Sequence, residues 1–373
     1  MTSIIENQPF ANLSTGLRAK ISGERVYTPH PSTPVSNYLA HTKRHCNGGR
    51  TVDAGLHLKQ HCDKGGKIFL TMSGAGSSFQ MGITIADLIR AGKIAAISVT
   101  GANLEESLYR LVANSHYAYI RNYEELTPEE EKELDRDEKR RITDTFLPET
   151  ESVRLILPHL MTLWQEAQDS GKRLLWHEYF FELFARNLIT PDPTARLEDC
   201  WLYEAWRHNI PIFVGGVEDS TMGNIFAHAC YDGTHHFLSQ FKLDKPLNPD
   251  IVHHSFRYMH SLAEWYMDNT GEHGLVFVQL GGGIAADFPI CVVPHLKKDY
   301  LAEHPLAFQE ASIRPWAGFI EIHTAPMSAG SYSGAGGKEK ITWSKLEPGA
   351  FMMQIWGDYT SIFPDMAAFV LAQ

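Results

Sequence analysis

The stretch Lys67-Ile-Phe-Leu-Thr-Met-Ser-Gly-Ala-Gly-Ser-Ser78 decides the fold class of this chain. Its first six residues are mostly apolar and predict a short buried strand, and the glycine-rich residues 73–78 predict a tight turn. Residues 79–91 then carry apolar side chains at helical spacing and stop at Gly92. A strand, a glycine turn and a helix in this order form the repeating unit of an α/β sheet.

The same unit recurs along the rest of the chain. Further strands are expected at 94–99, 211–214, 275–280, 318–323 and 350–356, and further helices at 104–112 and 359–371. This alternation predicts an α/β fold with a mostly parallel sheet and helices on both of its faces. Sites in such sheets lie at the carboxyl ends of the strands, where the polar and glycine-rich turns of this chain fall.

Two segments do not follow this pattern. Residues 1–64 lack sustained periodicity, so we expect an N-terminal extension that packs on the main body or on a neighbour, followed by one catalytic domain at 65–373. Residues 123–141 are very charged, and Thr127-Pro-Glu-Glu130 has the threonine cap, proline and glutamates of a helix start. A solvent-facing helix is expected there.

Composition narrows the function classes. The 373 residues are 43% hydrophobic, which is ample for a large core, and the formal net charge of −11 repels nucleic acid and attracts small polycations. No apolar run approaches the ~20 residues that span a bilayer. The five cysteines are scattered and the N-terminus has no secretory pattern, so a cytoplasmic protein without disulfides is expected. The 19 histidines show no metal-ligand spacing, so no metal is expected.

A second informative segment is Ser331-Tyr-Ser-Gly-Ala-Gly-Gly-Lys-Glu-Lys-Ile-Thr-Trp-Ser-Lys345. It runs from flexible glycines to Glu339, Trp343 and Lys345. An aromatic face near a lysine can exclude water from the ammonium group and lower its pKa toward neutrality. Such a lysine is nucleophilic and can form a Schiff base. A polar surface loop with ordinary solvated lysines fits the same residues.

The glycine turns have two interpretations as well. In residues 73–78 the glycines let backbone amides approach a phosphate at a helix N-terminus, although Phe79 stands where GxGxxG has its third glycine. A second glycine turn at 281–283 and the strand-end residues Thr100, Asp219 and Asp358 strengthen the case for a dinucleotide site. Tight packing of strands on helices explains the same glycines. Glu105 and Glu106 open a helix, where acids also serve as simple caps.

Four blocks of the sequence together resemble the deoxyhypusine synthase family, which includes homospermidine synthases. They are SGAGSS at 73–78 with VTGANLEES at 99–107, PIFVGGVEDSTMGN at 211–224, LGGG at 280–283, and SGAGGKEKITWSK at 333–345 followed by WGDY at 356–359. The resemblance runs from residue 67 to the C-terminus. It implies a Rossmann-like NAD-binding fold, a homotetramer with active sites between paired subunits, and transfer of a 4-aminobutyl group from spermidine through a lysine imine to an acceptor amine.

The resemblance also implies roles for single residues. Lys345 matches the nucleophilic lysine, Trp343 its tryptophan, Glu339 the polyamine-binding glutamate, and Glu105 a second acid near the polyamine. The residues that match NAD contacts are Gly74, Ala75, Gly76, Ser77, Ser78, Thr100, Gly101, Ala102, Glu106, Asp219, Gly282, Thr324, Ala325, Ser333, Asp358 and Tyr359.

Four polyamine-facing positions depart from deoxyhypusine synthase. The family's proton-transferring histidine is Asp287 here, which could replace it as the proton acceptor. At two positions where the family has an amine-binding aspartate, this chain has Asn224 and Tyr332. At a position where the family has an asparagine, it has Cys291. The lysine and NAD-contacting positions match the family, whereas the residues that would line the polyamine tunnel differ. This combination favours an NAD-dependent aminoalkyl transferase that acts on small di- or polyamines, as homospermidine synthase does.

Three alternatives remain open. The first is a true deoxyhypusine synthase, which modifies a lysine of a translation factor precursor. The second is an NAD-linked amine dehydrogenase, which would convert NAD stoichiometrically. The third is a protein that only binds NAD or polyamines, and the presence of Lys345, Trp343 and Glu339 argues against it because binding needs no nucleophile.

Overall fold

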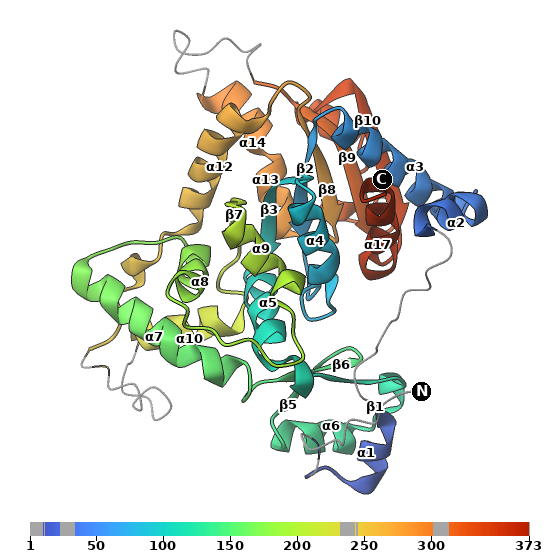
Figure 1. The fold of residues 1–373 in the computed structure, drawn as a ribbon. Helices are drawn as coiled ribbons and strands as arrows, with labels where there is room; N and C mark the ends of the chain where they lie inside the picture. The colour runs from blue at the N-terminus through green and yellow to red at the C-terminus, as the bar shows by residue number, and fades with distance from the viewer. Residues whose placement is uncertain are drawn as a thin grey trace.

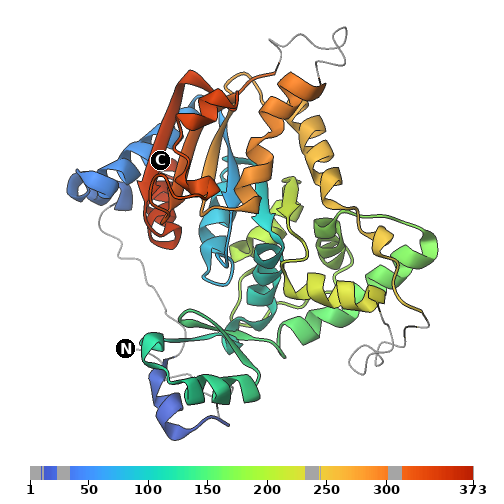
Figure 2. The ribbon, with the colours of Figure 1, turned by 180° about the vertical axis from the view of Figure 1, so that it is seen from behind.

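The computed structural model describes residues 10, 12–22, 34–231, 243, 245–300 and 313–372. Two sheets organise them, a parallel sheet of six strands and an antiparallel sheet of four. Helices cover both faces of the larger sheet, and the smaller sheet projects below it (Figures 1 and 2). No helix within these ranges is long and apolar enough to cross a membrane.

The larger sheet confirms the expected α/β fold. Its strands lie in the order β10 (Leu346–Trp356), β9 (Trp316–His323), β8 (Leu275–Leu280), β2 (Lys67–Met72), β3 (Ile94–Thr100) and β7 (Ile212–Gly215). All neighbours in this sheet are parallel. Counted in chain order from β7 to β10, the strands run 3-2-1-4-5-6, which is the order of dinucleotide-binding folds.

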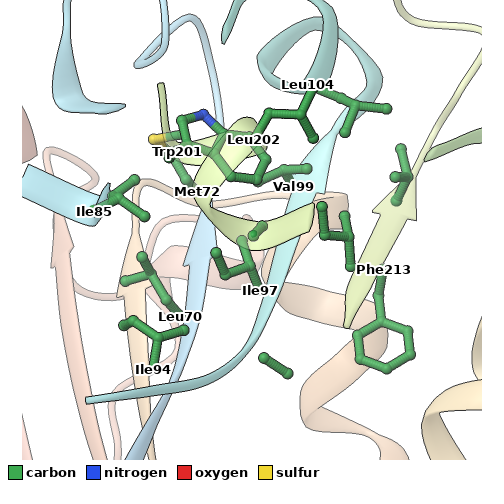
Figure 3. Packing of buried hydrophobic residues seen from close by; sticks show 14 of the residues in the cluster. Leu70, Met72, Ile85, Ile94, Ile97, Val99, Leu104, Trp201, Leu202 and Phe213 are labelled. Carbon is green, nitrogen blue, oxygen red and sulfur yellow. The ribbon is translucent and has the colours of Figure 1, made fainter. Parts of the chain in front are cut away.

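Continuous apolar runs form the central strands because both of their faces are covered. Every residue of β8 is buried, as is every residue of β2 except Lys67. The Phe69 ring stacks on Phe277 with centroids 5.5 Å apart and meets the edge of Trp316 at 5.1 Å. On the other face Leu70, Met72, Ile97 and Val99 pack under Trp201 and Leu202 of α9 (Trp201–Arg207), as Figure 3 shows.

The flanking helices divide between the two faces of the sheet. One face carries α3 (Cys46–Asp63), α4 (Met81–Arg90), α9 and α17 (Tyr359–Val370), which contact one another and the strands. The other carries α12 (Ser255–Asn269), α13 (Ile284–Ile290) and the short α14 (Val292–Pro294). The helix α5 (Gly101–Ala113) follows β3, and α16 (Glu339–Thr342) precedes β10. The expected helices near 79–91, 104–112 and 359–371 are thus confirmed.

Three further helices pack beyond β7 and were not expected from the sequence. They are α7 (Val153–Ser170), α8 (Trp176–Ala185) and α10 (Thr221–Tyr231). Aromatic side chains hold them together: Trp164 stacks on Trp176 at 5.8 Å, and Phe226 meets the edges of both rings. This cluster fixes α10, which contributes to the site described below.

Residue 10, residues 12–22 and residues 118–148 form a small lobe. It contains α1 (Thr15–Lys20), α6 (Pro128–Arg136) and the antiparallel strands β1 (Ile21–Ser22), β4 (Ala118–Ile120), β6 (Thr145–Pro148) and β5 (Lys139–Ile142), in the sheet order β1-β4-β6-β5. The expected helix start is confirmed, since Thr127 and Glu130 make a complete capping box. The helix is not wholly solvent-facing, because Leu134 joins a core with Leu17 and Phe146.

Part of the expected N-terminal extension belongs to the wall of the large sheet. The helix α3 packs on α17 and β10, while α2 (Val35–Thr42) packs beside them. Gly55 of α3 allows a close approach, because a Cβ at this position would lie 2.7 Å from Phe369 Cδ2. Residues 1–9, 11 and 23–33 of the expected extension lie outside the described residues.

This contact predicts that Gly55→Ala destabilises the protein. The added methyl group would push Phe369 out of place, and overpacking of this kind costs about 1–3 kcal/mol. The measurement is the urea midpoint followed by circular dichroism. The matched control is Gly16→Ala in α1, where a Cβ meets no atom within 4 Å; it should be neutral or slightly stabilising because alanine favours helix. Equal midpoints for Gly55→Ala and the wild type would contradict the packing described for α3.

Candidate active site

The carboxyl ends of the six parallel strands gather the residues predicted to bind the cofactor. Residues 74–78 follow β2, residues 100–102 end β3 and begin α5, Asp219 follows β7, Gly282 follows β8, Thr324 and Ala325 follow β9, and Asp358 and Tyr359 follow β10. Parallel strands present these ends at one edge of the sheet. The structure therefore brings together, at this edge, positions that are almost 300 residues apart in sequence.

Asn103 joins the two loops nearest the centre of this edge. Its side chain is fully buried, and its Nδ2 donates to Gly74 O at 2.7 Å and Met72 O at 3.2 Å. Its Oδ1 accepts from Ser77 N at 3.0 Å. The Asn103 amide thus forms hydrogen bonds with backbone groups before and after the start of this turn, and it fixes the turn against α5. Sequence reasoning missed this role, although Asn103 lies inside the VTGANLEES block.

Two glycines at this edge are needed for close approach. A Cβ on Gly76 would lie 2.6 Å from Met72 Sδ and 2.8 Å from Tyr359 Oη. A Cβ on Gly282 would lie 2.0 Å from the Oγ of Ser333, which is buried. A side chain at either position would displace Met72 and Tyr359 or Ser333, so these glycines allow the loops after β2, β8 and β9 to pack in one compact layer.

A cavity of about 800 Å³, which we call the cofactor-side cavity, opens beside this layer. Its lining comes from the turn after β2, the start of α17 and the small lobe: Gly74, Ala75, Ser78, Phe79, Gln80, Arg110, Ala118, Tyr119, Tyr123, Thr143, Asp144, Thr145, Asp358, Tyr359, Thr360 and Ser361. Its volume is typical of small-molecule and cofactor sites. Five of the predicted cofactor residues line it.

A second cavity of about 880 Å³ lies between the start of α5, the start of α10 and the small lobe. Its lining includes five predicted site residues: Ala102, Glu105, Glu106, Asp219 and Asn224. The Asn224 Nδ2 donates to Glu218 O at 3.0 Å and Ser220 O at 2.7 Å. Its carbonyl oxygen is the atom that remains for a ligand.

Glu105 and Glu106 are buried acids with different contacts. The Glu105 carboxylate accepts from Thr221 N at 2.7 Å and Met222 N at 2.8 Å, and so holds the N-terminus of α10. Glu106 accepts from Ser78 N at 3.3 Å. Burial raises the pKa of Glu105 to about 7 and, together with the charge of Glu105, the pKa of Glu106 to about 8. Both acids therefore change charge near neutral pH.

Lys345 lies away from the carboxyl edge. It immediately precedes β10, whose first residue Leu346 pairs with Trp316, the first residue of β9. Ser344 turns the chain in the left-handed region, with φ 59°, and directs the next residue into the fold. Only 7% of the Lys345 surface is exposed. A lysine that sequence alone could leave on a surface loop is buried.

Tyr332 is the common neighbour of two buried amines. Lys345 Nζ lies 5.9 Å from the centre of the Tyr332 ring, and Lys340 Nζ lies 4.1 Å from it. Burial raises the pKa of Tyr332, helped by the charges of Asp287 and Glu321, so the phenol stays protonated. These contacts bring Lys345, Tyr332 and Asp287 of the predicted site into one group.

The remaining predicted residues lie on the borders of this group. Trp343 is 59% exposed, and its ring centre is 5.8 Å from Lys345 Nζ, while Glu339 is exposed on α16. Asp287 lies in the first turn of α13, and Cys291 Sγ donates to its carbonyl oxygen at 3.2 Å. The Trp343–Lys345 proximity expected from their spacing is thus present, although Trp343 itself is largely exposed.

Glu321 and Lys340 belong to the same group and were missed by sequence reasoning. Both are buried, with exposed fractions of 1% and 2%. Glu321 and Phe319 are two residues apart in β9, so their side chains point to the same face of the sheet. Lys340 Nζ lies 5.7 Å from the Phe319 ring. The signal available in the sequence was a single acid inside an otherwise apolar strand.

Comparison with known proteins adds the family. The sequence model described as deoxyhypusine synthase matches residues 41–370. The chain is 27% identical to "Probable deoxyhypusine synthase 2" of Methanosarcina acetivorans, over 82% of this chain and 76% of that protein. It is 24% identical to "Probable deoxyhypusine synthase" of Methanocaldococcus jannaschii, over 85% of both chains. It is 25% identical to "Deoxyhypusine synthase-like protein" of Cyanothece sp., over 82% of this chain and 70% of that protein.

The raised pKa of Glu106 predicts a stability that depends on pH. In the unfolded chain this acid loses its proton near pH 4.5, whereas the folded protein holds the proton until about pH 8. The folded state therefore binds more protons in this window, and its stability falls as pH rises, by at most about 1.4 kcal/mol per pH unit. Glu106→Gln should remove this pH-dependent component, so the stability of the variant relative to the wild type should increase from pH 4.5 to about pH 8.

The measurement is the urea midpoint of wild type and Glu106→Gln at the two ends of the window. The control is Glu129→Gln on the exposed side of α6, which should follow the wild type at both pH values. A constant difference between Glu106→Gln and the wild type at every pH would show that Glu106 does not titrate in this range.

Proposed function

The chain belongs to the deoxyhypusine synthase family and is an aminobutyl transferase, and we propose that it carries the transferred group as an imine on Lys345. The observation that supports this most is the environment of the Lys345 amine. Nζ lies 5.8 Å from the Trp343 ring centre and 5.9 Å from the Tyr332 ring centre, and it has no hydrogen bond or ion pair with any residue that the structure describes. A desolvated amine without a partner is suited to nucleophilic attack on carbon.

We assign the cofactor-side cavity to NAD. The strand order 3-2-1-4-5-6, the glycine turn after β2 and the close packing at Gly76 and Gly282 fit a dinucleotide that lies against the first residues of this turn, since the N–H groups of Ser77 and Ser78 already donate to Asn103 and Glu106. Bound NAD would accept a hydride from the donor amine and return it to the product. Lys345 would displace 1,3-diaminopropane from the oxidised spermidine, and the acceptor amine would then displace Lys345 from its imine. The residues proposed to hold it are those predicted from the sequence, with Asp358 and Tyr359 at the start of α17.

The remaining polar residues take roles that follow from their positions. Asp287, half-exposed beside Tyr332, is the acid that we propose accepts a proton from the donor amine. Glu339 is exposed and can attract an ammonium group at the entrance. Glu105 and Asn224 border the second cavity, where a positively charged amine end would meet the buried acids.

Two acceptors are compatible with this chemistry. The names of the curated relatives favour a deoxyhypusine synthase, whose acceptor is a lysine of a protein, over the small amine that the sequence pattern favoured. A small di- or polyamine is the second candidate, because Asn224 and Tyr332 are uncharged where the resemblance implies carboxylates. A simple amine dehydrogenase is the third reading, and it differs by accumulating NADH in proportion to product.

We further propose that the active site is completed by a second copy in a homotetramer. Neither cavity described above is lined by Lys345, Asp287 or Tyr332. The exposed Trp343 ring beside the lysine also offers an apolar surface to a neighbouring subunit. The cysteines at 46, 62, 200, 230 and 291 are free thiols, which fits a cytoplasmic protein.

The imine predicts a trapped adduct on Lys345. Purified protein is incubated with NAD and spermidine, reduced with borohydride and digested, and the peptides are read by mass spectrometry. We expect an aminobutyl mass on Lys345 and none when NAD is omitted. Lys345→Ala should lose transfer by several orders of magnitude while still binding NAD. Lys338→Ala, on the exposed side of the same segment, is the control and should keep the adduct; an adduct on Lys338 or Lys340 would contradict the assignment.

The identity of the acceptor can be determined by comparing two kinds of acceptor in the same assay. The wild type receives labelled spermidine and NAD with either the translation factor precursor or a panel of diamines, and products are measured by mass spectrometry together with NADH absorbance. Label on one lysine of the precursor without net NADH supports the deoxyhypusine synthase reading. Label in homospermidine alone supports a small-amine acceptor. In that case the double variant Asn224→Asp with Tyr332→Asp should label the precursor in place of homospermidine. NADH in proportion to product would contradict both.

A further inference from the structure

The hydroxyl group of Tyr332 has no part in the reaction as described so far. Tyr332 Oη is buried and makes no hydrogen bond with any residue that the structure describes. A buried hydroxyl without a partner costs stability, because it has lost its hydrogen bonds to water. Such groups are uncommon in native proteins, and a catalytic role is one reason to keep them.

This hydroxyl lies near both residues that are proposed to react. Lys345 Nζ is 5.9 Å from the centre of the Tyr332 ring. Burial raises the pKa of the phenol, and the charges of Asp287 and Glu321 raise it further, so both acids lie close to the hydroxyl. The phenol therefore stays protonated at neutral pH.

The proposed reaction contains proton transfers to which no residue has been assigned. When the Lys345 amine adds to the imine carbon of the oxidised donor, that carbon carries two nitrogens. In the addition and again in the departure of the donor nitrogen, one proton must pass from the Lys345 nitrogen to the donor nitrogen. The Lys345 amine thus loses two protons and gains a double bond to carbon. The donor nitrogen loses its double bond, gains both protons and leaves as a primary amine.

We propose that the Tyr332 hydroxyl relays these protons: its oxygen accepts a proton from the Lys345 nitrogen while its own proton passes to the leaving nitrogen of the donor. This inference rests on the proposed function, in which Lys345 carries the transferred group. A hydroxyl can donate and accept at the same time, and it is unchanged after each step. The leaving nitrogen is the one from which Asp287 is proposed to accept a proton, and Asp287 and Lys345 are both neighbours of Tyr332.

The test separates transfer to Lys345 from oxidation of the donor. Wild type and Tyr332→Phe are each mixed rapidly with NAD and spermidine. NADH absorbance reports oxidation of the donor, and borohydride added at timed intervals traps the Lys345 adduct for mass spectrometry. Tyr332→Phe keeps the aromatic ring beside Lys345 and removes only the hydroxyl. The matched control is Tyr38→Phe, at an exposed tyrosine of α2.

The loss in Tyr332→Phe should fall on the adduct. We expect the adduct to form about 10²–10⁴-fold more slowly, which is the usual effect of removing a general acid–base group. NADH should appear well before the adduct, because the oxidised donor waits for Lys345. The urea midpoint should stay at or above the wild-type value, since the variant no longer buries an unpartnered hydroxyl. Tyr38→Phe should match the wild type in all three measurements.

Adduct formation in Tyr332→Phe at the wild-type rate overturns the proposal. So does a parallel loss of adduct, NADH and urea midpoint, which a purely structural role of the hydroxyl would produce. Should Tyr332→Phe fail to fold, adduct formation by the wild type in mixtures of light and heavy water decides. A curved dependence on the deuterium fraction supports two protons that move in one step, and a linear dependence overturns the relay.

The same experiment distinguishes this inference from the function on which it rests. Absence of any Lys345 adduct in the wild type would contradict the proposed function itself. A normal adduct in the wild type and an equally fast one in Tyr332→Phe would contradict the relay alone.

Discussion

The position of β2 between β3 and β8 is the constraint on which the rest of the site depends. The chain adds β3 and β7 on one side of β2 and then returns to add β8, β9 and β10 on the other. The helices that follow β2 and β8, α4 and α13, therefore lie on opposite faces of the sheet. The turns at their starts diverge above the end of β2, and this divergence leaves room for a ligand. Asn103 fixes one of these turns, and the close approach of Ser333 to Gly282 fixes the other.

A second theme is the separation of two kinds of chemistry. The carboxyl edge of the sheet offers glycines, backbone amides and helix starts, which suit phosphate groups. The group around Tyr332 lies against β9 and α13 and offers amines and acids in an apolar setting. Glu105 and Glu106 at the first place are buried too, but backbone N–H groups of the turn after β2 and of α10 donate to them. At the second place charges are costly, and this cost makes their protonation sensitive to each neighbour.

The parts of the structure that were predictable are those encoded locally. Strands β2 and β8 are continuous apolar runs bounded by glycine, and α6 begins with its own capping box, so short windows of sequence contain the whole signal. The helix α3 was missed because its pattern is weak and its stability comes from α17, across the contact of Gly55 with Phe369. The strand β1 has two residues and finds its partner in β4, far along the chain. The glycine turns and Lys345 were predicted as site residues from the local sequence and from the family resemblance, whereas Glu321 and Lys340 were not, because only the structure shows that they are buried.

The small lobe has a consequence for the order in which the protein forms. Ile21 of β1 pairs with Ile120 of β4, so the lobe closes a segment of about one hundred residues. During synthesis, β1 leaves the ribosome long before β4 and β6 exist, and it has no partner until they do. Pairings between such distant segments form slowly, because the entropy of closing the loop is lost before contacts are gained. The lobe also supplies one wall of the cofactor-side cavity. The opposite wall, at the start of α17, is made last of all, so the cavity is complete only when segments from both ends of the chain have met.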